Sequence, residues 1–178
     1  MSVAGLAVLS IVVLGGCAIE GGADPEAGTG GAATVVRNVD GDTVVVEIDG
    51  REEPVRFIGI DTPESVAQDR PVECFGPEAK ARTAELLPVG TVVRLERDVE
   101  ARDRYDRLLA YVFRESDGVL VNLLLVEEGY AESSAYPPNT ARQGELDRAE
   151  TAARAAGRGL WPACGGTSTP IGPVASAP

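Results

Sequence analysis

The sequence predicts a small α+β domain, in which a β barrel or sheet is accompanied by two or three helices. Five segments have the composition or alternation of strands, while helical patterns are few and segregated from them, an arrangement typical of α+β folds. Gly41 and Gly59 interrupt the strand segments and are expected to mark β-bulges. The expected strands are residues 34–39, 43–48, 54–60, 91–98 and 108–114.

The second and third strand segments are joined by Asp49-Gly50, and Asp-Gly between two β-rich runs is a strong signal for a two-residue hairpin turn. Such a hairpin brings the start of its first strand beside the end of its second, so Asp42 and Asp61 are expected to lie close together. Two neighbouring carboxylates repel each other unless a cation lies between them. Oxygen ligands suit a hard cation such as Ca²⁺, although turn chemistry alone also accounts for acidic residues at the rim of a sheet.

Three helices are expected. The first begins at residues 76–78, Gly-Pro-Glu, because proline suits the first turn and an acidic side chain suits the positive end of a helix. A short second helix near residues 121–125 is stopped by Gly129. The third is expected to start where Thr140 and Gln143, three positions later, form a capping box.

The first residues are typical of an export signal. Residues 3–14 form a nearly unbroken apolar run that is shorter than the roughly 20 residues needed to span a bilayer, and it fits a secretory signal peptide over residues 1–16. Residues 14–17, Leu-Gly-Gly-Cys, are similar to a bacterial lipobox, which predicts lipidation of Cys17. The alternative is an ordinary signal peptide with an incidental cysteine. The protein is therefore expected to be exported, and either lipid-anchored at the outer face of a bacterial cell membrane or secreted.

The rest of the chain divides into a tether, one folded domain and a tail. Residues 17–32 are rich in glycine, alanine and acidic residues, cannot bury a core and are expected to form a flexible tether. The length of 178 residues suits one domain, placed at residues 33–164. Residues 165–178 are expected to be a disordered tail.

Two cysteines, Cys74 and Cys164, lie within the expected domain. In an exported protein a disulfide between them is the expected state, and two separate buried thiols are the alternative. A bridge across this separation should stabilise the fold by roughly 4–5 kcal/mol in the loop-entropy account. It is expected to act on stability and to leave any functional site unaffected.

Charge and composition restrict the classes of function. The net charge is −12, which argues against tight, extended binding of a polyanion, although local arginines and a metal can still hold one phosphate. The chain has no histidine, which excludes histidine triads, histidine general bases and His-rich zinc sites. A non-catalytic OB-type module for single-stranded nucleic acid would need basic stripes and exposed aromatic residues, and only 4% of residues are aromatic. A surface-tethered Ca²⁺-binding interaction protein fits the acidic charge and the tether.

Four short motifs follow one another along the chain: Asp42-Thr43, Arg56, Asp61-Thr62-Pro63-Glu64 and Tyr105-Asp106-Arg107. In combination and in this order they resemble the staphylococcal nuclease, or thermonuclease-like, family over residues 33–164. The resemblance implies a five-stranded OB-fold-type β-barrel with about three α-helices. It also implies a Ca²⁺-dependent endonuclease that hydrolyses phosphodiester bonds of DNA or RNA by attack of water. A monomer is the default expectation, with membrane contact only through the lipid anchor.

The resemblance assigns metal and phosphate contacts to particular residues. Asp42, Asp61 and the backbone carbonyl of Thr62 are the implied Ca²⁺ ligands. Arg56 and Arg107 are the implied catalytic arginines, and a planar, permanently charged guanidinium suits a phosphate group well.

Further roles are implied for residues around these groups. Glu64 corresponds to the catalytic carboxylate that positions the attacking water. Arg104, Tyr105 and Tyr136 correspond to substrate-binding positions, where the two aromatic rings flank a nucleotide. Ser134 stands where the family typically has another tyrosine, which predicts weaker stacking on the substrate.

Each catalytic candidate also has a purely structural alternative. Arg56 is an ordinary ion-paired strand residue in that alternative, and Glu64 is a cap of the turn after the preceding proline. Arg107 has Asp103 and Asp106 close by in sequence as ion-pair partners. Asp106 stands where the family usually has glycine, and it is expected to compete with substrate for Arg107.

Overall fold

The computed structural model describes residues 29–65 and 72–167, together with Met1. The predicted signal peptide, the lipobox with Cys17, and most of the predicted tether and tail lie outside the described residues. Along the chain the elements are β1 (Thr29–Asp40), β2 (Thr43–Ile48), β3 (Arg51–Phe57), β4 (Ile60–Asp61), α1 (Gly76–Leu86), β5 (Val92–Glu96), β6 (Leu108–Arg114), β7 (Val119–Leu120), α2 (Val121–Glu127), β8 (Glu132–Ser133), α3 (Gln143–Ala155) and α4 (Leu160–Cys164).

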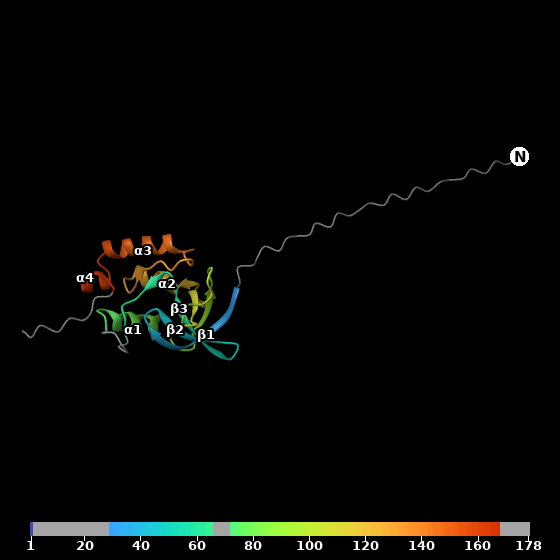
Figure 1. Cartoon of the computed structure of the whole chain (residues 1–178), viewed down its shortest axis with the longest axis horizontal. Helices are drawn as coiled ribbons and strands as arrows, with labels where there is room; N and C mark the ends of the chain where they lie inside the picture. Colours follow the sequence, from blue (N-terminus) through green and yellow to red (C-terminus); the bar gives the residue numbers. More distant parts are fainter. Residues whose placement is uncertain (2–28, 66–71, 168–178) are drawn as a thin grey trace, which may run out of the picture.

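Five strands close into a barrel, which confirms the predicted α+β class and its OB-fold type. β3, β2, β1, β5 and β6 are successive antiparallel neighbours, and β3 also pairs in parallel with β6, so that the sheet closes on itself. Figure 1 shows the helices gathered on one side of the strands. The described residues contain four helices instead of about three, because α4 forms a short separate helix near the end of the domain.

Tight turns connect the first three strands. Asp49 and Gly50 have φ values of 51° and 74° and lie between the paired residues Ile48 and Arg51, so the predicted two-residue hairpin is confirmed. β1 and β2 are joined in the same way, because Asp40 pairs with Thr43 across the turn. β1 begins at Thr29, earlier than expected, and so extends into the predicted tether.

The expectation of bulges at Gly41 and Gly59 is wrong, because both glycines lie in turns. Gly59 has a φ of 80°, a region that favours glycine. A Cβ atom at Gly41 would lie 2.7 Å from the Thr62 side-chain oxygen, so glycine is needed there for close approach of these two segments. The register shifts of β1 against β2 fall within β1 itself.

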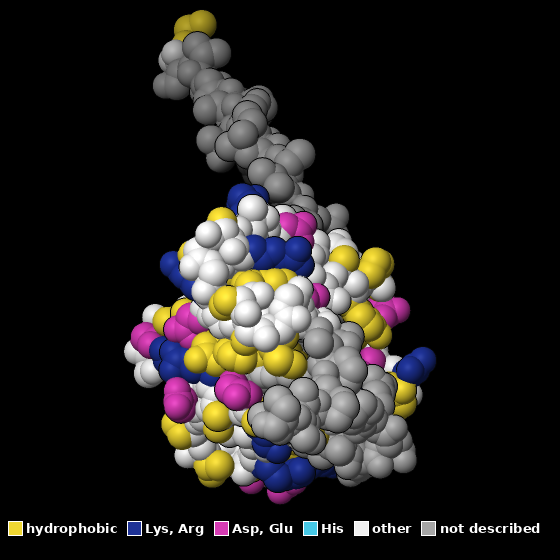
Figure 2. Space-filling model, turned by 90° about the vertical axis from the view of Figure 1, so that its left-hand side faces the viewer, with side chains coloured by type: hydrophobic (Ala, Val, Ile, Leu, Met, Phe, Trp, Pro, Cys, Tyr) yellow, Lys and Arg dark blue, Asp and Glu magenta, His cyan; other side chains and the backbone are white. Residues whose placement is uncertain are grey.

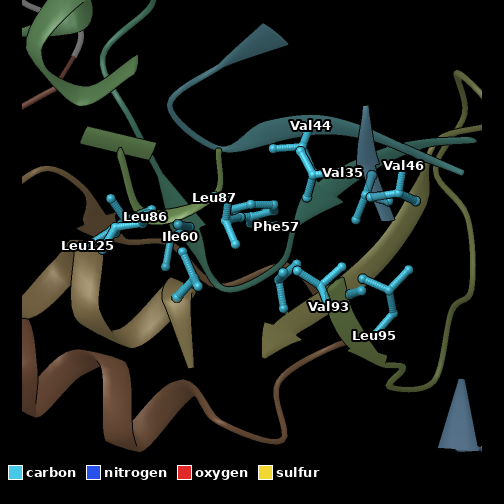
Figure 3. Packing of buried hydrophobic residues seen from close by; sticks show 14 of the residues in the cluster. Val35, Val44, Val46, Phe57, Ile60, Leu86, Leu87, Val93, Leu95 and Leu125 are labelled. Carbon is cyan, nitrogen blue, oxygen red and sulfur yellow. The ribbon is translucent and has the colours of Figure 1, made fainter. Parts of the chain in front are cut away.

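Apolar side chains from all five barrel strands fill the interior. β5 alternates as predicted, with Val93 and Leu95 buried between half-buried charged residues. In β6 every residue from Leu108 to Phe113 is buried, since one face of the strand points into the barrel and the other packs in a second apolar cluster. Figure 3 shows the barrel core, to which the labelled residues Val35, Val44, Val46, Phe57, Ile60, Leu86, Leu87, Val93, Leu95 and Leu125 contribute.

The helices start close to the expected positions, but the predicted capping box is wrong. α3 begins at Gln143, with Arg142 at the N-cap position and no side-chain capping bond. The Gln143 amide nitrogen instead donates to the hydroxyl of Ser133 and to Asp147. Gln143 is therefore used to hold α3 against β8, and it is not available to cap the helix from inside.

The C-terminal segment is fastened to the start of α1. Cys74 and Cys164 form a disulfide, with 5.9 Å between the two Cα atoms and 90 positions between them in sequence. Leu160, at the start of α4, is fully buried and its N–H donates to the carbonyl of Gly129 at 2.9 Å. Within the described part of the chain, no helix has the length and apolar character needed to cross a membrane.

A buried polar residue that the sequence pattern did not reveal joins α2 to the barrel. The side-chain nitrogen of Asn122 donates to the carbonyl of Ile58 at 2.9 Å, and its oxygen accepts the N–H of Val112 at 2.9 Å. Asn122 is fully buried, and its side chain satisfies one backbone carbonyl and one backbone N–H inside the fold.

Asn122→Ala should lower the free energy of unfolding by about 2–3 kcal/mol, because it leaves a buried N–H and a buried carbonyl without partners. Urea denaturation followed by tryptophan fluorescence measures the difference. Thr151→Ala, on the exposed face of α3, is the control and should change the free energy by less than about 0.5 kcal/mol. A cost at Asn122 as small as at Thr151 would show that its hydrogen bonds do not stabilise the barrel.

Candidate active site

The site begins at Asp42, in the turn between β1 and β2. Its side chain is nearly inaccessible to solvent, with 5% of the residue exposed. One carboxylate oxygen accepts the hydroxyl of Thr43 at 3.0 Å, and the other accepts both the N–H and the hydroxyl of Thr62 at 3.1 Å. Asp42 therefore ties the first turn of the barrel to the segment that follows β4.

Arg56, near the end of β3, lies between the two aspartates. One guanidinium nitrogen forms an ion pair with Asp42, and another donates to Asp61 at 2.7 Å and to the carbonyl of Ile60 at 3.4 Å. The hairpin thus brings the two carboxylates to one place, as the sequence predicted. The cation found between them is the guanidinium of Arg56.

Electrostatic interactions link this group to two more of the expected residues. Burial lowers the pKa of Arg56, Asp61 raises it, the positive charge of Arg107 lowers it and the negative charge of Glu64 raises it. Arg56 remains a cation in spite of these shifts, since a guanidinium stays protonated in proteins. The charges of Asp61, Glu64 and Arg107 therefore all act on Arg56.

Backbone contacts fix the segment that carries Glu64. Its N–H donates to the carboxylate of Glu73 at 3.0 Å, and its carbonyl accepts the N–H of Glu73 at 2.9 Å. The start of α1 also lies directly against it, because a Cβ atom at Gly76 would be 2.3 Å from the Glu64 carbonyl oxygen. Glycine at this position allows the helix to approach the catalytic candidate.

Arg107 is paired with Asp103, not with Asp106. Two of its guanidinium nitrogens lie 2.7 Å from one Asp103 oxygen, while the other oxygen accepts the N–H groups of Tyr105 and Arg107. The expectation that Asp106 draws Arg107 away from substrate is therefore wrong. Asp106 has a φ of 65°, which turns its exposed side chain towards Arg102, 3.6 Å away.

The acidity of Asp103 reflects this arrangement. Burial raises the pKa of its carboxyl group, but hydrogen bonds from Arg107 and Tyr105 outweigh burial and hold the pKa below its ordinary value of 3.8. Folding thus favours the charged form of Asp103. The Asp103 carboxylate in turn orders the loop that carries Arg107.

The substrate-binding candidates lie around the site but do not all point the same way. Tyr105 is 63% exposed, and Arg104 stacks on its ring at 4.7 Å and donates to its hydroxyl at 2.6 Å. Tyr136 lines a small cavity of about 40 Å³ together with Arg56 and Ser134. The structure therefore brings Tyr136 to Arg56, and places Tyr105 beside Arg107, whose guanidinium lies 5.5 Å from its ring centre.

Two contributors to the site, Glu73 and Gly76, were missed by reasoning from the sequence, and Thr62 was expected only as a metal ligand through its carbonyl. The N–H and hydroxyl of Thr62 bind Asp42, and Glu73 and Gly76 support Glu64. The motif Asp-Thr-Pro-Glu gave a signal for Thr62, since a threonine beside an aspartate often donates to a carboxylate. No local pattern pointed to Glu73 or Gly76, because the residue that they contact, Glu64, lies nine or more positions earlier in the sequence.

The residues fit a hard cation by their chemistry. Asp42 and Asp61 offer carboxylate oxygens, the ligands that Ca²⁺ prefers, and their joint charge exceeds that of Arg56 by one negative unit. Over residues 29–65 and 72–167 there is no group of three or more His, Cys, Asp or Glu side chains that could hold a metal by themselves. A cation here would therefore need backbone oxygens or water to complete its ligands, and Arg56 would have to yield its place between the carboxylates.

Beyond this site the basic residues are largely neutralised. Figure 2 shows basic and acidic side chains interspersed over one face of the molecule. Most arginines of the described surface have an acidic partner. The pairs include Arg82 with Glu128, Arg102 with Glu53, Arg114 with Asp117 and Arg142 with Glu96.

Fold and site together define an OB-fold-type domain with arginines and carboxylates arranged at one end of the barrel, a combination suited to a phosphate group. The sequence model of the family described as staphylococcal nuclease homologue matches residues 54–163. The chain belongs to this family.

Relatives that are named as nucleases support the same grouping. Thermonucleases of Staphylococcus hyicus and Staphylococcus intermedius are each 39% identical to this chain over 127 residues, which make up 71% of this chain and 73% and 74% of theirs. Endonuclease YncB of Bacillus subtilis is 36% identical over 130 residues, which are 72% of this chain and 60% of its own.

Asp103 should make stability depend on pH in the acid range. Because its folded pKa is lowered, its contribution is complete above the ordinary value of 3.8 and is lost as the pH falls through the folded value. Asp103→Asn should therefore cost about 1–3 kcal/mol at pH 7 and flatten the decline of unfolding free energy below about pH 4. Urea titrations from pH 7 to pH 2 test this, with the exposed turn variant Asp49→Asn as control. An Asp103→Asn curve parallel to that of the wild type at all pH values would refute the assignment.

Proposed function

We propose that this chain is a Ca²⁺-dependent endonuclease in which Arg56, Arg107 and Glu64 act on one phosphodiester group. Hydrolysis of phosphodiester bonds in nucleic acid follows from membership of the staphylococcal nuclease family. The observation that supports these roles is the placement of Arg56 between Asp42 and Asp61, where the charges of Arg107 and Glu64 also act on it. It supports a single site in which two cations and a carboxylate act on one phosphate.

The two arginines have the properties needed to bind a phosphate whose charge grows during the reaction. Arg56 is held at the end of β3 with little exposure, so its charge acts in an environment of low polarisability. Arg107 lies on an ordered loop and is partly exposed. Both guanidinium groups are engaged by carboxylates at rest, and a phosphate would replace these partners with equally charged oxygens. Positioned cations of this kind supply most of the stabilisation in phosphoryl transfer.

Glu64 is the carboxylate that orients the attacking water in this proposal. The water oxygen bonds to phosphorus as the bond from phosphorus to the 5′ oxygen breaks, and Glu64 receives the proton that the water loses. The leaving oxygen takes a proton from solvent. A carboxylate is a modest base, so its main contribution is to hold the water in line with the leaving group.

A divalent cation completes the proposed site. Asp42, Asp61 and the Thr62 carbonyl would hold it, and Ca²⁺ bound there would act as a Lewis acid on the phosphate. The almost complete burial of Asp42 supports a fixed ligand, whereas the side chain of Asp61 is 43% exposed and faces the incoming substrate or solvent.

The substrate in this proposal is DNA or RNA. Tyr105 is exposed beside Arg107 and can stack on a base or sugar, while Tyr136 borders the cavity next to Arg56. Ser134, which stands where the family typically has a tyrosine, lines the same cavity. Substrate affinity should therefore rest more on phosphate contacts than on stacking of aromatic rings. Arg104 is placed to reach a further phosphate if it leaves the Tyr105 hydroxyl.

Export and lipidation at Cys17 remain part of the proposal. The disulfide between Cys74 and Cys164 supports an oxidising location, because such bridges persist mainly outside the cytosol. A tethered monomer at the outer face of the membrane, or a secreted one, would meet extracellular nucleic acid there.

Asp61→Asn should abolish measurable hydrolysis of a labelled DNA oligonucleotide and weaken Ca²⁺ binding measured by calorimetry, while wild type should lose activity in excess chelator. Asp61 is a better test than Asp42, because removal of the Asp42 carboxylate would also leave three buried donors of Thr43 and Thr62 without an acceptor.

The control for this experiment is Asp49→Asn, in an exposed turn away from the site. It should bind Ca²⁺ and cleave DNA like the wild type. Full activity of the wild type in excess chelator would disprove the role of the metal, and retardation of DNA without cleavage would indicate a binding module instead of a nuclease.

A further inference from the structure

The backbone of Glu64 is clasped from both sides by one residue. Its N–H donates to the side-chain carboxylate of Glu73 at 3.0 Å, and its carbonyl accepts the backbone N–H of Glu73 at 2.9 Å. Glu73 thus satisfies both polar backbone groups of Glu64. A carboxylate acceptor makes the first of these bonds a charge-assisted one, which is stronger than a bond between neutral groups.

Glu73 is itself held at the entrance of α1. Its carbonyl accepts the N–H of Gly76 at 3.0 Å, which forms a turn into the helix. Gly76 lies so close to Glu64 that a Cβ atom there would be 2.3 Å from the Glu64 carbonyl oxygen. The position of Glu64 therefore depends on where the turn at residues 73–76 sits.

The residue next to Glu73 joins this turn to the far end of the domain. Cys74 forms the disulfide with Cys164, the last residue of α4. α4 is anchored in turn, because Leu160 is fully buried and its N–H donates to Gly129 at 2.9 Å. The bridge thus connects a fixed helix to the residue adjacent to the clasp.

We propose that Glu73 is a positioning residue for Glu64, and that the Cys74–Cys164 bridge keeps Glu73 in place, so that the rate of hydrolysis depends on the oxidised state of the bridge. This rests on the proposed role of Glu64 in orienting water. It differs from the expectation that the bridge affects stability alone, because the structure places Cys74 beside the clasp.

Loss of the contacts between Glu73 and Glu64 should affect kcat and KM differently. Arg56 is carried by β3 and Arg107 by the loop that Asp103 orders, so neither of the two phosphate-binding arginines lies on the segment that holds Glu73. A displaced Glu64 would orient water poorly while substrate still binds. A displacement near 1 Å can cost up to about 10²-fold in rate. Loss of the clasp should therefore lower kcat and leave KM nearly unchanged.

The first experiment compares Glu73→Ala and Glu73→Gln in the full chain, with saturating Ca²⁺ and a labelled DNA oligonucleotide. Glu73→Ala should lower kcat at least about tenfold with KM changed less than about twofold. Glu73→Gln keeps an acceptor oxygen and should recover most of the rate. Glu78→Ala, at an exposed position in the first turn of α1, is the matched control and should behave like the wild type.

A second readout needs no metal and no substrate. Amide hydrogen exchange, followed by nuclear magnetic resonance, reports on the Glu64 N–H that the Glu73 carboxylate accepts. Its exchange should become at least about tenfold faster in Glu73→Ala than in Glu78→Ala. The N–H of Leu109 donates to the carbonyl of Ala101, outside the turn at residues 73–76, and it should exchange at the same rate in both variants.

A third experiment tests the bridge by treating the wild type with a dithiol. The dithiol reduces Cys74 and Cys164 to thiols and is itself oxidised to a cyclic disulfide. Below the melting temperature of the reduced protein, kcat should fall and exchange at Glu64 should quicken, as in Glu73→Ala. Cys74→Ser/Cys164→Ser should show the same lowered kcat with or without the dithiol. A reduced protein with unchanged kcat and unchanged exchange would overturn the role of the bridge.

A double-mutant cycle separates this proposal from the proposed function. Glu73→Ala should have no further effect in a Glu64→Gln background, because it acts through Glu64. If Glu64→Gln is slow but Glu73→Ala keeps the wild-type kcat, or slows both backgrounds equally, the positioning role is overturned and the function stands. If Glu64→Gln is as fast as the wild type, the catalytic role of Glu64 fails. The proposed effect of Glu73 on the rate of hydrolysis is then overturned as well. The exchange rate of the Glu64 N–H still tests whether Glu73 holds the backbone of Glu64.

Discussion

The structure depends on a guanidinium that is largely removed from water and placed between two carboxylates. A buried charge is tolerated only when it is paired, and Arg56 obtains its partners from the turn before β2 and from β4. Those partners are brought to it by the β2–β3 hairpin and by the contacts of Asp42 with Thr62. The contacts that join the first strands of the barrel therefore also place Arg56, Asp42 and Asp61 together.

This constraint explains why an acidic protein can act on a polyanion. The net charge of −12 is spread over a surface where most arginines of the described residues are neutralised, while the cations that matter are fixed by packing at one place. Arg107 is ordered by Asp103 in the same way that Arg56 is ordered by Asp42 and Asp61. In each case a carboxylate holds the guanidinium ready for a phosphate, which spares the entropy of ordering a long side chain when substrate binds.

Local sequence was sufficient for the features that local physics decides. The Asp49-Gly50 turn, the alternation of Val93 and Leu95, and the meeting of Asp42 with Asp61 all follow from hairpin geometry and strand periodicity. Features that join distant segments were not readable. Asn122 contacts a residue 64 positions away, and Glu73 contacts one nine positions away across a loop, so neither contact has a local pattern. The expectation that Asp106 competes for Arg107 was wrong, because Arg107 pairs with Asp103 and the side chain of Asp106 lies towards Arg102.

The central claim is that Arg56 is both the paired charge of the barrel and a phosphate ligand, and Arg56→Lys tests it most directly. Lysine keeps the charge for Asp42 and Asp61 but loses the bidentate geometry that a guanidinium offers a phosphate. The control is Arg51→Lys, at an exposed position on the same strand. Single-turnover cleavage of a DNA oligonucleotide in Ca²⁺ should be slower by about 10²-fold in Arg56→Lys than in this control. The melting temperatures of the two variants should be close to each other. Cleavage by Arg56→Lys at the rate of Arg51→Lys would contradict the account.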